Sequence, residues 1–342
     1  MNKKIGILSA GGDCPGINAT IRGVGKTAIV EYGMEVIGIL DGFSGLIYND
    51  YLPLEEKMLS GILNLGGTIL GTSREKPFKK KDNDPIADKP LLIKQNYDKL
   101  GLDALVCIGG NGTQKTAGQL AQLGLHVVGI PKTIDNDVWG TDVTFGFDTA
   151  VQIASEAIDR LHSTANSHKR VMVIEVMGHK AGWLALYSGM ASGGDVILIP
   201  ELEYDLDRVN EVLLNRSKKG KPYSIVVVAE GIEVPDGRRA GEYIAQSIQE
   251  STRLETRETV LGYIQRGGSP SPMDRILSTR LGSYAADLIH REEFGMMAAI
   301  RDNQAVAVPL SEVGGKTRLV PEDHYLITEG RKMGVFFGSP AS

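Results

Sequence analysis

Two carboxylates lie close together in the stretch PKTIDND, residues 131–137, which directly follows the apolar run 127–130. If this stretch stays extended, its side chains alternate, and Thr133, Asp135 and Asp137 share one face. Like charges on one face repel each other unless a cation or hydrogen-bond donors intervene. The pair therefore indicates either a site that binds a cation or a polar exit from a strand that caps the following helix.

Three glycine-rich stretches offer backbone N–H groups to a ligand. Loop one, GGDCPGIN, covers residues 11–18; loop two, GGTILGTSR, covers 66–74; loop three, IGGNGTQKTA, covers 108–117. Glycine permits close approach of the backbone to a ligand, and the start of a helix favours phosphate. The amides of Gly110, Gly112 and Thr113 are suited to cradle phosphates. Arg74, at the end of loop two, is either a phosphate ligand or an ordinary surface arginine.

These stretches need elements that hold them in place. Strands are predicted over 5–9, 35–40, 104–108, 127–130, 171–176, 196–199, 225–229 and 258–264, and helices over 17–32, 90–100, 114–123, 149–167 and 182–191. This alternation predicts parallel sheets covered by helices. Ligands of open α/β sheets bind beyond the carboxyl ends of the strands, which is where the loops and the acidic stretch fall.

The composition argues against several other classes of protein. The 37 basic and 42 acidic residues give a net charge of −5 without a basic stripe, so nucleic acid is not expected as the partner. Two cysteines exclude a disulfide framework, and no apolar run reaches the ~18 residues of a membrane span. The apolar run after Lys3 and Lys4 is too short for a signal peptide. We therefore expect a soluble cytoplasmic enzyme or binding protein.

The three loops and the acidic pair together suit phosphoryl transfer. In such a site a nucleotide or pyrophosphate lies across the strand ends, and its Mg²⁺ offsets the carboxylates. One aspartate then faces the attacking hydroxyl. Phosphoryl transfer depends on positioning and charge neutralisation above all, and the sequence provides groups for both.

Six motifs occur in an order that resembles a known family. They are GGDCPGIN, GGNGT, PKTIDND, SHKRVMVIEVMG, AEG and ETRETVLGYIQRGGSPSPMDR. Together they cover essentially residues 3–300 and resemble the 6-phosphofructokinase family of the A type. The resemblance implies transfer of the terminal phosphoryl group of ATP, with Mg²⁺, to the 1-hydroxyl of fructose 6-phosphate, which gives fructose 1,6-bisphosphate in glycolysis. A minority of the family uses pyrophosphate as the donor.

The resemblance also implies roles for single residues. Asp135 matches the general base for the sugar hydroxyl, and Thr133 and Asp137 match residues that orient substrate and metal–phosphate. The residues on the donor side are Gly11, Phe43, Arg74, Gly110, Asn111, Gly112 and Thr113. Those on the sugar-phosphate side are Thr133, Asp135, Asp137, Met177, Gly178, His179, Glu230, Tyr263 and Arg266. Arg170 and Arg257 match arginines supplied across a subunit interface, which implies a homo-oligomer, either a dimer or a tetramer.

The sequence departs from the family pattern at three of these positions. Asn111 stands where relatives carry a metal-associated aspartate; its neutral amide can still meet Mg²⁺ but contributes less charge. His179 replaces a catalytic arginine, and a histidine is only partly charged near neutral pH. The neighbouring Lys180 is able to compensate. Tyr263 replaces a histidine, and its hydroxyl can donate the same hydrogen bond.

Two positions favour opposite phosphoryl donors. Gly112 leaves room for a nucleotide where pyrophosphate users place an aspartate, whereas Lys132 resembles the pyrophosphate type. Steric exclusion decides more than an added attraction, so we expect ATP, with a pyrophosphate-dependent enzyme as the alternative. An NAD-kinase-like enzyme would share only loop three. A non-catalytic sensor of sugar phosphate or nucleotide is the remaining alternative, although it would have no need of Asp135.

The resemblance implies a fold and a regulatory property as well. The predicted fold has two three-layer α/β/α domains with mainly parallel sheets. Residues 1–146 with 265–315 form the domain that binds ATP and Mg²⁺, and residues 147–264 with 316–342 form the fructose 6-phosphate domain and the C-terminal tail. Arg22, Lys219 and Lys221 match basic positions of the bacterial effector pocket. Glu56 and His162 replace arginines there, which predicts weak regulation by anionic effectors.

Overall fold

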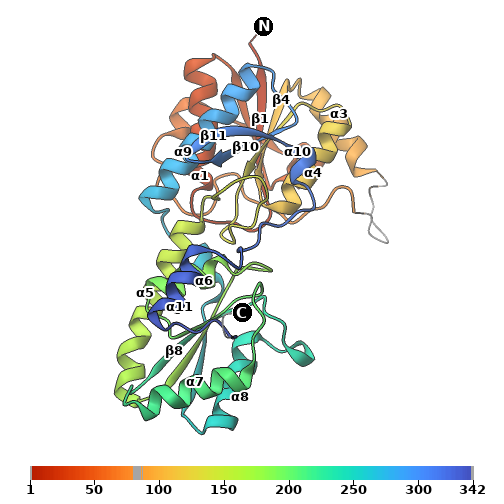
Figure 1. Ribbon diagram of the computed structural model, residues 1–342. Coiled ribbons are helices and arrows are strands. Elements are labelled where there is room, and N and C mark those ends of the chain that lie inside the picture. Colours follow the sequence, from red (N-terminus) through yellow and green to blue (C-terminus); the bar gives the residue numbers. More distant parts are fainter. Residues whose placement is uncertain (1, 80–85, 87, 340–342) are drawn as a thin grey trace. The chain divides into compact units, whose positions relative to one another are not determined.

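The computed structural model describes residues 2–79, 86 and 88–339, and it divides the chain into two compact units (Figure 1). Unit 1 comprises Met1–Thr133, Val138–Asp148 and Arg266–Thr317, and unit 2 comprises Ile134–Asp137, Thr149–Gln265 and Arg318–Ser342. The boundaries of the two predicted domains differ from these by one or two residues. The short excursion of residues 134–137 into unit 2 was not predicted.

Unit 1 contains a seven-stranded mixed sheet in the order β11-β10-β5-β4-β1-β2-β3. Its strands are β1 Lys4–Ala10, β2 Glu35–Ile39, β3 Tyr51–Pro53, β4 Ala104–Gly109, β5 Val127–Pro131, β10 Met296–Arg301 and β11 Gln304–Pro309. The five central strands are parallel, and the two edge strands pair antiparallel to their neighbours. The carboxyl ends of β1, β4 and β5 therefore meet at one edge, which carries loops one and three and the acidic stretch.

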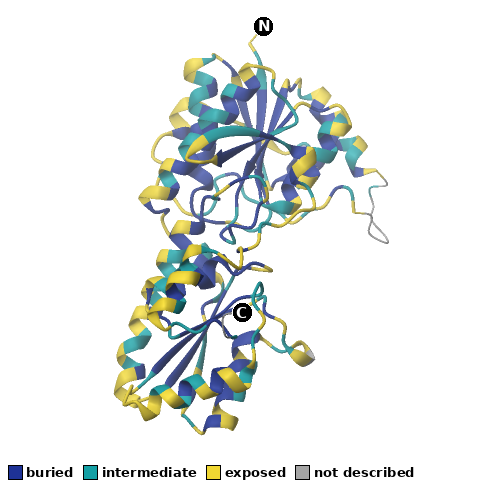
Figure 2. Cartoon of the chain, in the orientation of Figure 1, coloured by how far each residue is buried: buried dark blue, intermediate teal, exposed yellow. Residues whose placement is uncertain are grey.

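Helices cover both faces of this sheet because side chains of alternate strand residues point to opposite faces. Leu8, Leu105 and Cys107 pack in one core cluster with side chains of the helices on their side. Those helices are α2 Phe43–Tyr48, α3 Lys89–Lys99, α4 Asn111–Gln122 and α10 Leu310–Val313. The other face is covered by α1 Ile17–Lys26, its π-helical extension η1 Thr27–Glu31, and α9 Pro272–His290 (Figure 1). Figure 2 shows the buried strands between half-exposed helices.

Unit 2 contains a four-stranded parallel sheet in the order β7-β8-β6-β9. Its strands are β6 Val171–Val176, β7 Val196–Leu198, β8 Ser224–Ala229 and β9 Thr256–Val260. Its helices are α5 Phe147–His168, which begins in unit 1, α6 Trp183–Ala191, α7 Leu206–Lys218, α8 Ala240–Thr252 and α11 Tyr325–Met333. Helices α6 and α11 lie on one face of this sheet, and α7 and α8 lie on the other (Figure 1). The remaining short elements are the 3-10 turns η2 Glu56–Leu59, η3 Pro235–Gly237 and η4 Gly262–Arg266.

The predicted α/β class with mainly parallel sheets is confirmed, and one predicted strand is too long. The strand predicted over 258–264 ends at Val260, because Gly262 adopts φ 54° and the chain turns into η4. The antiparallel edge strands β3 and β11 were not predicted. None of the described helices is both long and apolar enough to cross a membrane.

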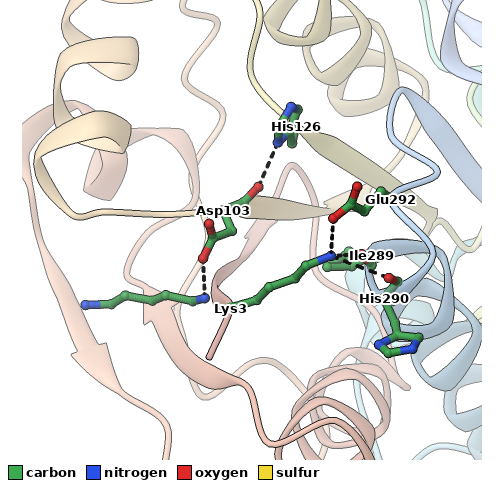
Figure 3. A network of polar contacts seen from close by, with 7 residues as sticks. Lys3, Asp103, His126, Ile289, His290 and Glu292 are labelled. Carbon is green, nitrogen blue, oxygen red and sulfur yellow. Dashed lines mark hydrogen bonds and ion pairs between the residues drawn. The ribbon is translucent and has the colours of Figure 1, made fainter. Parts of the chain in front are cut away.

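A polar network fastens the opposite, amino edge of the unit 1 sheet (Figure 3). Lys3 Nζ donates to Glu292 Oε1 at 2.9 Å, and the N–H of Lys4 donates to Asp103 Oδ2 at 2.6 Å. His126 Nδ1 lies 3.0 Å from the carbonyl oxygen of Asp103. These residues flank the starts of β1, β4 and β5 and the end of α9. Structural contacts thus occupy this edge, and the glycine-rich loops occupy the other.

Candidate active site

Loops one and two are hydrogen-bonded to each other in unit 1. The N–H of Gly11 donates to the carbonyl oxygen of Ser73 at 2.9 Å, and Thr72 Oγ1 donates to the carbonyl oxygen of Gly11 at 2.8 Å. Gly11 has φ +87°, a backbone conformation that residues other than glycine rarely adopt. Loop one therefore leaves β1 through a left-handed turn that is fixed by loop two.

The buried side chain of Asn18 holds the start of loop two. Its Nδ2 donates to the carbonyl oxygens of Leu65 and Gly66, each at 3.1 Å, and its Oδ1 accepts from the N–H of Ile69 at 2.8 Å. In the sequence, Asn18 stands out only as the last residue of loop one. An asparagine that uses both amide atoms on a distant loop serves to position that loop.

Loop three meets loop one at Thr113. Thr113 is buried, and its Oγ1 donates to the carbonyl oxygen of Ala10 at 3.3 Å. A Cβ at Gly109 would collide with the Thr113 side chain, so this glycine is required by packing. A Cβ at Gly11 would lie 3.8 Å from Thr113 Oγ1. The ends of β1 and β4 thus bring two glycine-rich loops together.

Gln114 is a second positioning residue that the sequence analysis missed. Its fully buried Nε2 donates to the carbonyl oxygens of Gly109 at 2.7 Å and Ile130 at 2.8 Å. These carbonyls lie at the ends of β4 and β5. The available signal was a polar residue in the buried stripe of a predicted helix, which normally requires hydrogen-bond partners.

Gly112, unlike Gly109, is not required by packing. It is exposed near the start of α4, and its φ lies outside the left-handed region. Apart from its two chain neighbours and the nearby backbone of α4, no atom of the residues that the structure describes lies within 4 Å of the position a Cβ would take. The fold therefore accepts a larger residue at Gly112, and the space beside it is open.

Lys132 is buried at the end of β5 and braces loop one. Its Nζ donates to the carbonyl oxygen of Ala10 at 3.1 Å and to that of Gly12. A Cβ at Gly11 would lie 3.8 Å from this ammonium group. The sequence analysis considered Lys132 only for donor choice. The structure adds a hydrogen-bonding role, because two of the three ammonium donors point at backbone carbonyls.

The acidic stretch does not stay extended, and the expectation that Thr133, Asp135 and Asp137 alternate onto one face is wrong. Ile134 and Asp135 form a turn, and Asn136 follows in the left-handed region at φ 53°. Asp135 is half-buried, whereas Asp137 is 6% exposed. We call residues 133–137 the acidic turn. Its first residue belongs to unit 1 and the other four to unit 2.

Four predicted sugar-phosphate residues come together at the carboxyl edge of the unit 2 sheet. Met177, Gly178 and His179 follow β6, and Glu230 follows the adjacent β8. The N–H of His179 donates to Glu230 Oε1 at 2.9 Å, and the N–H of Glu230 donates to the carbonyl oxygen of Val176 at 2.9 Å. His179 adopts φ 53° and exposes its side chain. The hydrogen bond from its N–H to Glu230 thus fixes the position of the His179 backbone, from which the imidazole side chain projects.

Tyr263 and Arg266 lie in η4, after β9. The Tyr263 side chain is 73% exposed. Gln265 lies between them and is fully buried, and its Oε1 accepts from the N–H of Met177 at 3.3 Å. Arg266 lies within unit 1, and a Cβ at Gly12 would be 2.8 Å from its Nη1. The structure therefore places the Arg266 guanidinium against loop one.

Arg170 and Arg257 lie at the opposite, amino edge of the unit 2 sheet. Arg170 precedes β6, and Arg257 is paired with Met172 near the start of that strand. Both arginines share Glu255, with Nη2 to Oε1 distances of 2.9 Å and 2.7 Å respectively. The hydrogen bond from Arg170 and the charges of both arginines hold the pKa of Glu255 below its ordinary value. Within one chain these arginines are a strand's length away from Met177 and Glu230.

The predicted contact of Phe43 with a nucleotide requires a correction. Its side chain is 1% exposed and packs in the core between the sheet and α2. An aromatic ring enclosed in this way has no face left for a base, so only the backbone at this position is available. Arg74, in contrast, is exposed and directly follows Ser73 of loop two.

Comparison with known proteins agrees with this arrangement of loops. The family model described as Phosphofructokinase matches residues 4–289. The chain belongs to the phosphofructokinase family. The ATP-dependent 6-phosphofructokinase 3 of Bacteroides thetaiotaomicron is 64% identical over 98% of this chain and 100% of its own length. The pyrophosphate–fructose 6-phosphate 1-phosphotransferase of Streptomyces coelicolor is 45% identical over 98% of this chain and 100% of its own.

A solved phosphofructokinase has the same fold. The T-state phosphofructokinase of Pichia pastoris superposes with a TM-score of 0.84 at 34% identity over 92% of this chain. The present chain spans 35% of that yeast chain. The phosphofructokinase fold of unit 1 and unit 2 is therefore shared with a much longer relative.

The residues of this phosphofructokinase fit a magnesium ion that arrives with its nucleotide. Asn111, the first residue of α4, is half-buried and offers an amide oxygen. In the described part of the chain, no three histidine, cysteine or acidic side chains gather in a group that could hold a metal. Mg²⁺ commonly binds one or two protein oxygens together with substrate phosphates. We therefore treat the ion as part of the substrate MgATP.

The two positions at which the sequence lacks the arginines expected of an effector pocket have partners within their own units. In unit 1, Glu56 forms an ion pair with Lys26 at 3.5 Å. In unit 2, His162 Nδ1 lies 3.0 Å from the hydroxyl of Tyr223, and its Nε2 lies 2.8 Å from the carbonyl oxygen of Ser192. Neither position offers the cation of the replaced arginine to an anion.

We therefore expect the saturation curve for fructose 6-phosphate to be hyperbolic and insensitive to ADP and phosphoenolpyruvate. An anionic effector gains little binding energy at a pocket that lacks the expected positive charges. Initial rates measured over a range of fructose 6-phosphate, with and without each effector, test this expectation. A sigmoidal curve that ADP converts to a hyperbolic one would contradict it.

Proposed function

We propose that this chain is an ATP-dependent 6-phosphofructokinase of the cytoplasm. It transfers the terminal phosphoryl group of MgATP to the 1-hydroxyl of fructose 6-phosphate and releases fructose 1,6-bisphosphate and ADP. The observation that carries the proposal is the placement of the acidic turn. It leaves β5, which lies beside β4 with loop three, and β4 in turn lies beside β1 with loop one.

The residues of the chain then have distinct tasks. The amides of loops one and three and the guanidinium of Arg74 bind the donor phosphates, where helix starts favour negative charge. Asp135 accepts the proton of the 1-hydroxyl as the new oxygen–phosphorus bond forms. Met177, Gly178, Glu230 and Tyr263 bind the sugar phosphate. His179, with Lys180 beside it, supplies positive charge for the transferred group.

The donor is assigned from the open space at Gly112. A nucleotide extends beyond the two terminal phosphates, and no described atom fills that space. Lys132 favours phosphate in general, but its ammonium already donates to the carbonyl oxygen of Ala10 at the end of β1 and to that of Gly12 in loop one. The closely similar Bacteroides relative is named for ATP, whereas the more distant Streptomyces relative is named for pyrophosphate. Pyrophosphate is therefore the runner-up donor.

A donor assay tests the function directly. Fructose 1,6-bisphosphate is measured from fructose 6-phosphate and Mg²⁺, with ATP and pyrophosphate in parallel wells. We expect product with ATP alone. Product with pyrophosphate alone would show that Lys132 and Asn111, and not Gly112, set the donor. Absence of product with either donor would favour the non-catalytic sensor.

We further propose a homo-oligomer, dimer or tetramer, in which a neighbouring subunit completes the sugar-phosphate pocket. Arg170 precedes the six-residue strand β6, and Met177 follows it, so their backbones are separated by about 20 Å. An arginine side chain is much shorter than this separation, so it does not span β6 along its own chain. Bidentate guanidinium groups suit phosphate oxygens, so Arg170 and Arg257 are expected to serve a partner's site.

Coexpression of two inactive variants tests the shared site. We expect Asp135→Ser and Arg170→Ser to be inactive alone and active when assembled together. In the mixed oligomer one site combines an intact Asp135 with an intact Arg170 from the other subunit. Differently tagged chains allow the mixed species to be purified and its turnover compared with that of each variant. Mixed oligomers that stay inactive, or an active wild-type monomer, would contradict the proposal.

A further inference from the structure

The acidic turn is held by a residue from the far end of the sequence, Arg318. In unit 2 the N–H of Arg318 donates to the carbonyl oxygen of Asp137 at 2.8 Å, and its Nη1 donates to the carbonyl oxygen of Asn136 at 2.9 Å. One residue earlier, Thr317 forms an antiparallel bridge with Val138. Residues 136–138, which directly follow Asp135, are thus contacted by residues 317 and 318.

Arg318 is itself held in place by Trp183. Its guanidinium carbon lies 4.0 Å from the centre of the indole ring, and the indole N–H donates to the carbonyl oxygen of Arg318 at 3.0 Å. Trp183 is 2% exposed and is the first residue of α6, four residues after His179. A planar guanidinium can stack on an aromatic ring and donate in its own plane at the same time.

The segment that follows Arg318 is anchored as well. The N–H of Val320 donates to Glu201 Oε1 at 3.0 Å, and the same carboxylate accepts from the N–H of Gly182 at 2.9 Å. Further along, Phe336 forms a bridge with Val196 of β7. Arg318 therefore projects from a backbone that is fixed on both sides, which is what a rigid support for another loop needs.

We propose that Arg318 is a positioning residue, which fixes the acidic turn so that Asp135 faces the acceptor hydroxyl; this inference rests on the proposed function. Asn136 occupies the left-handed region, which carries a conformational cost for residues other than glycine, although a smaller one for asparagine than for most. The hydrogen bonds to its carbonyl and to the next one offset that cost. Without the guanidinium bond the turn relaxes, and a shift of about 1 Å in a reacting group lowers turnover by roughly 10²-fold.

Two substitutions test the inference against a matched control. Arg318→Met removes the charge and the donors, and Arg318→Lys keeps the charge but loses the planar group. Arg208→Met is the control, because Arg208 lies on the exposed face of α7 and pairs only with the exposed Glu211 among the described residues. We expect Arg318→Met to lower kcat by about 10- to 100-fold with unchanged binding of fructose 6-phosphate, Arg318→Lys to recover part of it, and the control to match wild type.

A double variant separates positioning from a general loss of structure. If Arg318 acts through Asp135, adding Arg318→Met to Asp135→Ser lowers kcat no further, because residues that act as a unit are not additive. Additive losses, or a kcat of Arg318→Met equal to that of wild type, would overturn the inference. Arg318→Lys serves the same comparison if Arg318→Met does not fold.

Hydrogen exchange gives a readout that does not depend on activity. We expect faster exchange of the amides of residues 134–138 in Arg318→Met than in wild type or Arg208→Met, because the turn loses the guanidinium hydrogen bond to the carbonyl oxygen of Asn136. Unchanged exchange there would overturn the inference whatever the enzyme does. A wild-type protein that forms no product with either donor would instead overturn the proposed function, while the exchange result would still report on Arg318.

Discussion

Replacing Asp135 with Ser is expected to lower kcat by about 10²-fold or more, with little change in the affinity for fructose 6-phosphate. The 1-hydroxyl must lose its proton as the new bond to phosphorus forms, and a serine hydroxyl cannot accept that proton at neutral pH. The ground-state sugar is held mainly by other residues, among them Met177, Gly178 and Glu230. Turnover should therefore fall while binding persists.

The structure makes this variant informative because Asp135 has little part in the core. It is half-buried in a turn whose neighbouring carbonyls are bound by Arg318, so removal of the carboxylate leaves those backbone contacts in place. The measurement is steady-state kcat with saturating MgATP, together with equilibrium binding of fructose 6-phosphate.

Two further variants control this experiment. Asp135→Asn keeps the shape of the side chain without its basicity and should be as impaired as Asp135→Ser. Asp159→Ser changes an exposed aspartate of α5 and should resemble wild type. Near-normal turnover in Asp135→Ser would remove Asp135 from its proposed role and return attention to Asp137.

Replacing Gly112 with Asp is expected to abolish most activity with ATP while leaving the fold intact. The new carboxylate would occupy the open space near the start of α4, where a nucleotide continues beyond its transferred phosphates. Two like charges about 4 Å apart near a protein surface repel by roughly 4 kcal/mol. We therefore expect kcat/KM for ATP to fall by about 10²- to 10³-fold.

Stability should not fall with activity in this variant. Apart from the chain neighbours and the nearby backbone of α4, no described atom lies within 4 Å of the added Cβ, and α4 has no acidic residue in its first turn. An acidic side chain there interacts favourably with the helix dipole by about 0.3–1 kcal/mol. Thermal unfolding of Gly112→Asp should therefore match or slightly exceed that of wild type.

Comparison with Gly112→Asn and Gly112→Ala separates charge from bulk. The asparagine has almost the size of the aspartate and no charge, and the alanine adds only a methyl group. For each variant, kcat/KM is measured once with ATP and once with pyrophosphate as the donor. If Gly112→Asp keeps its activity with ATP, steric and electrostatic exclusion at this position do not set the donor, and Lys132 becomes the residue to change next.

Local patterns in the sequence predicted the class of fold well. Runs such as 127–130 and 171–176 are almost entirely apolar, with Glu175 the one charged residue, as expected of strands buried on both faces, and they coincide closely with β5 and β6. The end of β9 was misplaced because Val260, Leu261 and Ile264 continue an apolar pattern across Gly262. A positive φ at that glycine ends the strand, and hydrophobic periodicity does not detect a backbone angle.

The candidate site was predictable only in the residues that a motif brings together. Glycine loops and the acidic stretch are read from neighbours along the chain. Asn18, Gln114 and Arg318 each act on at least one partner that lies 16 to 182 residues away, and no local spacing indicates such pairs. The assignment of Phe43 failed for a related reason, because burial depends on which distant segments cover a side chain. The catalytic roles themselves remain predictions for the experiments above.

The order of strands in unit 1 has a consequence for folding during synthesis on the ribosome. Val128 of β5 pairs with Met296 of β10, although 168 residues separate them (296 minus 128). At a synthesis rate of about 5–20 residues per second, β5 waits roughly 10–30 s for this partner. During that time one side of an apolar parallel strand is unpaired, and such edges recruit other chains. The nascent chain is therefore expected to need chaperone protection until the last third has emerged.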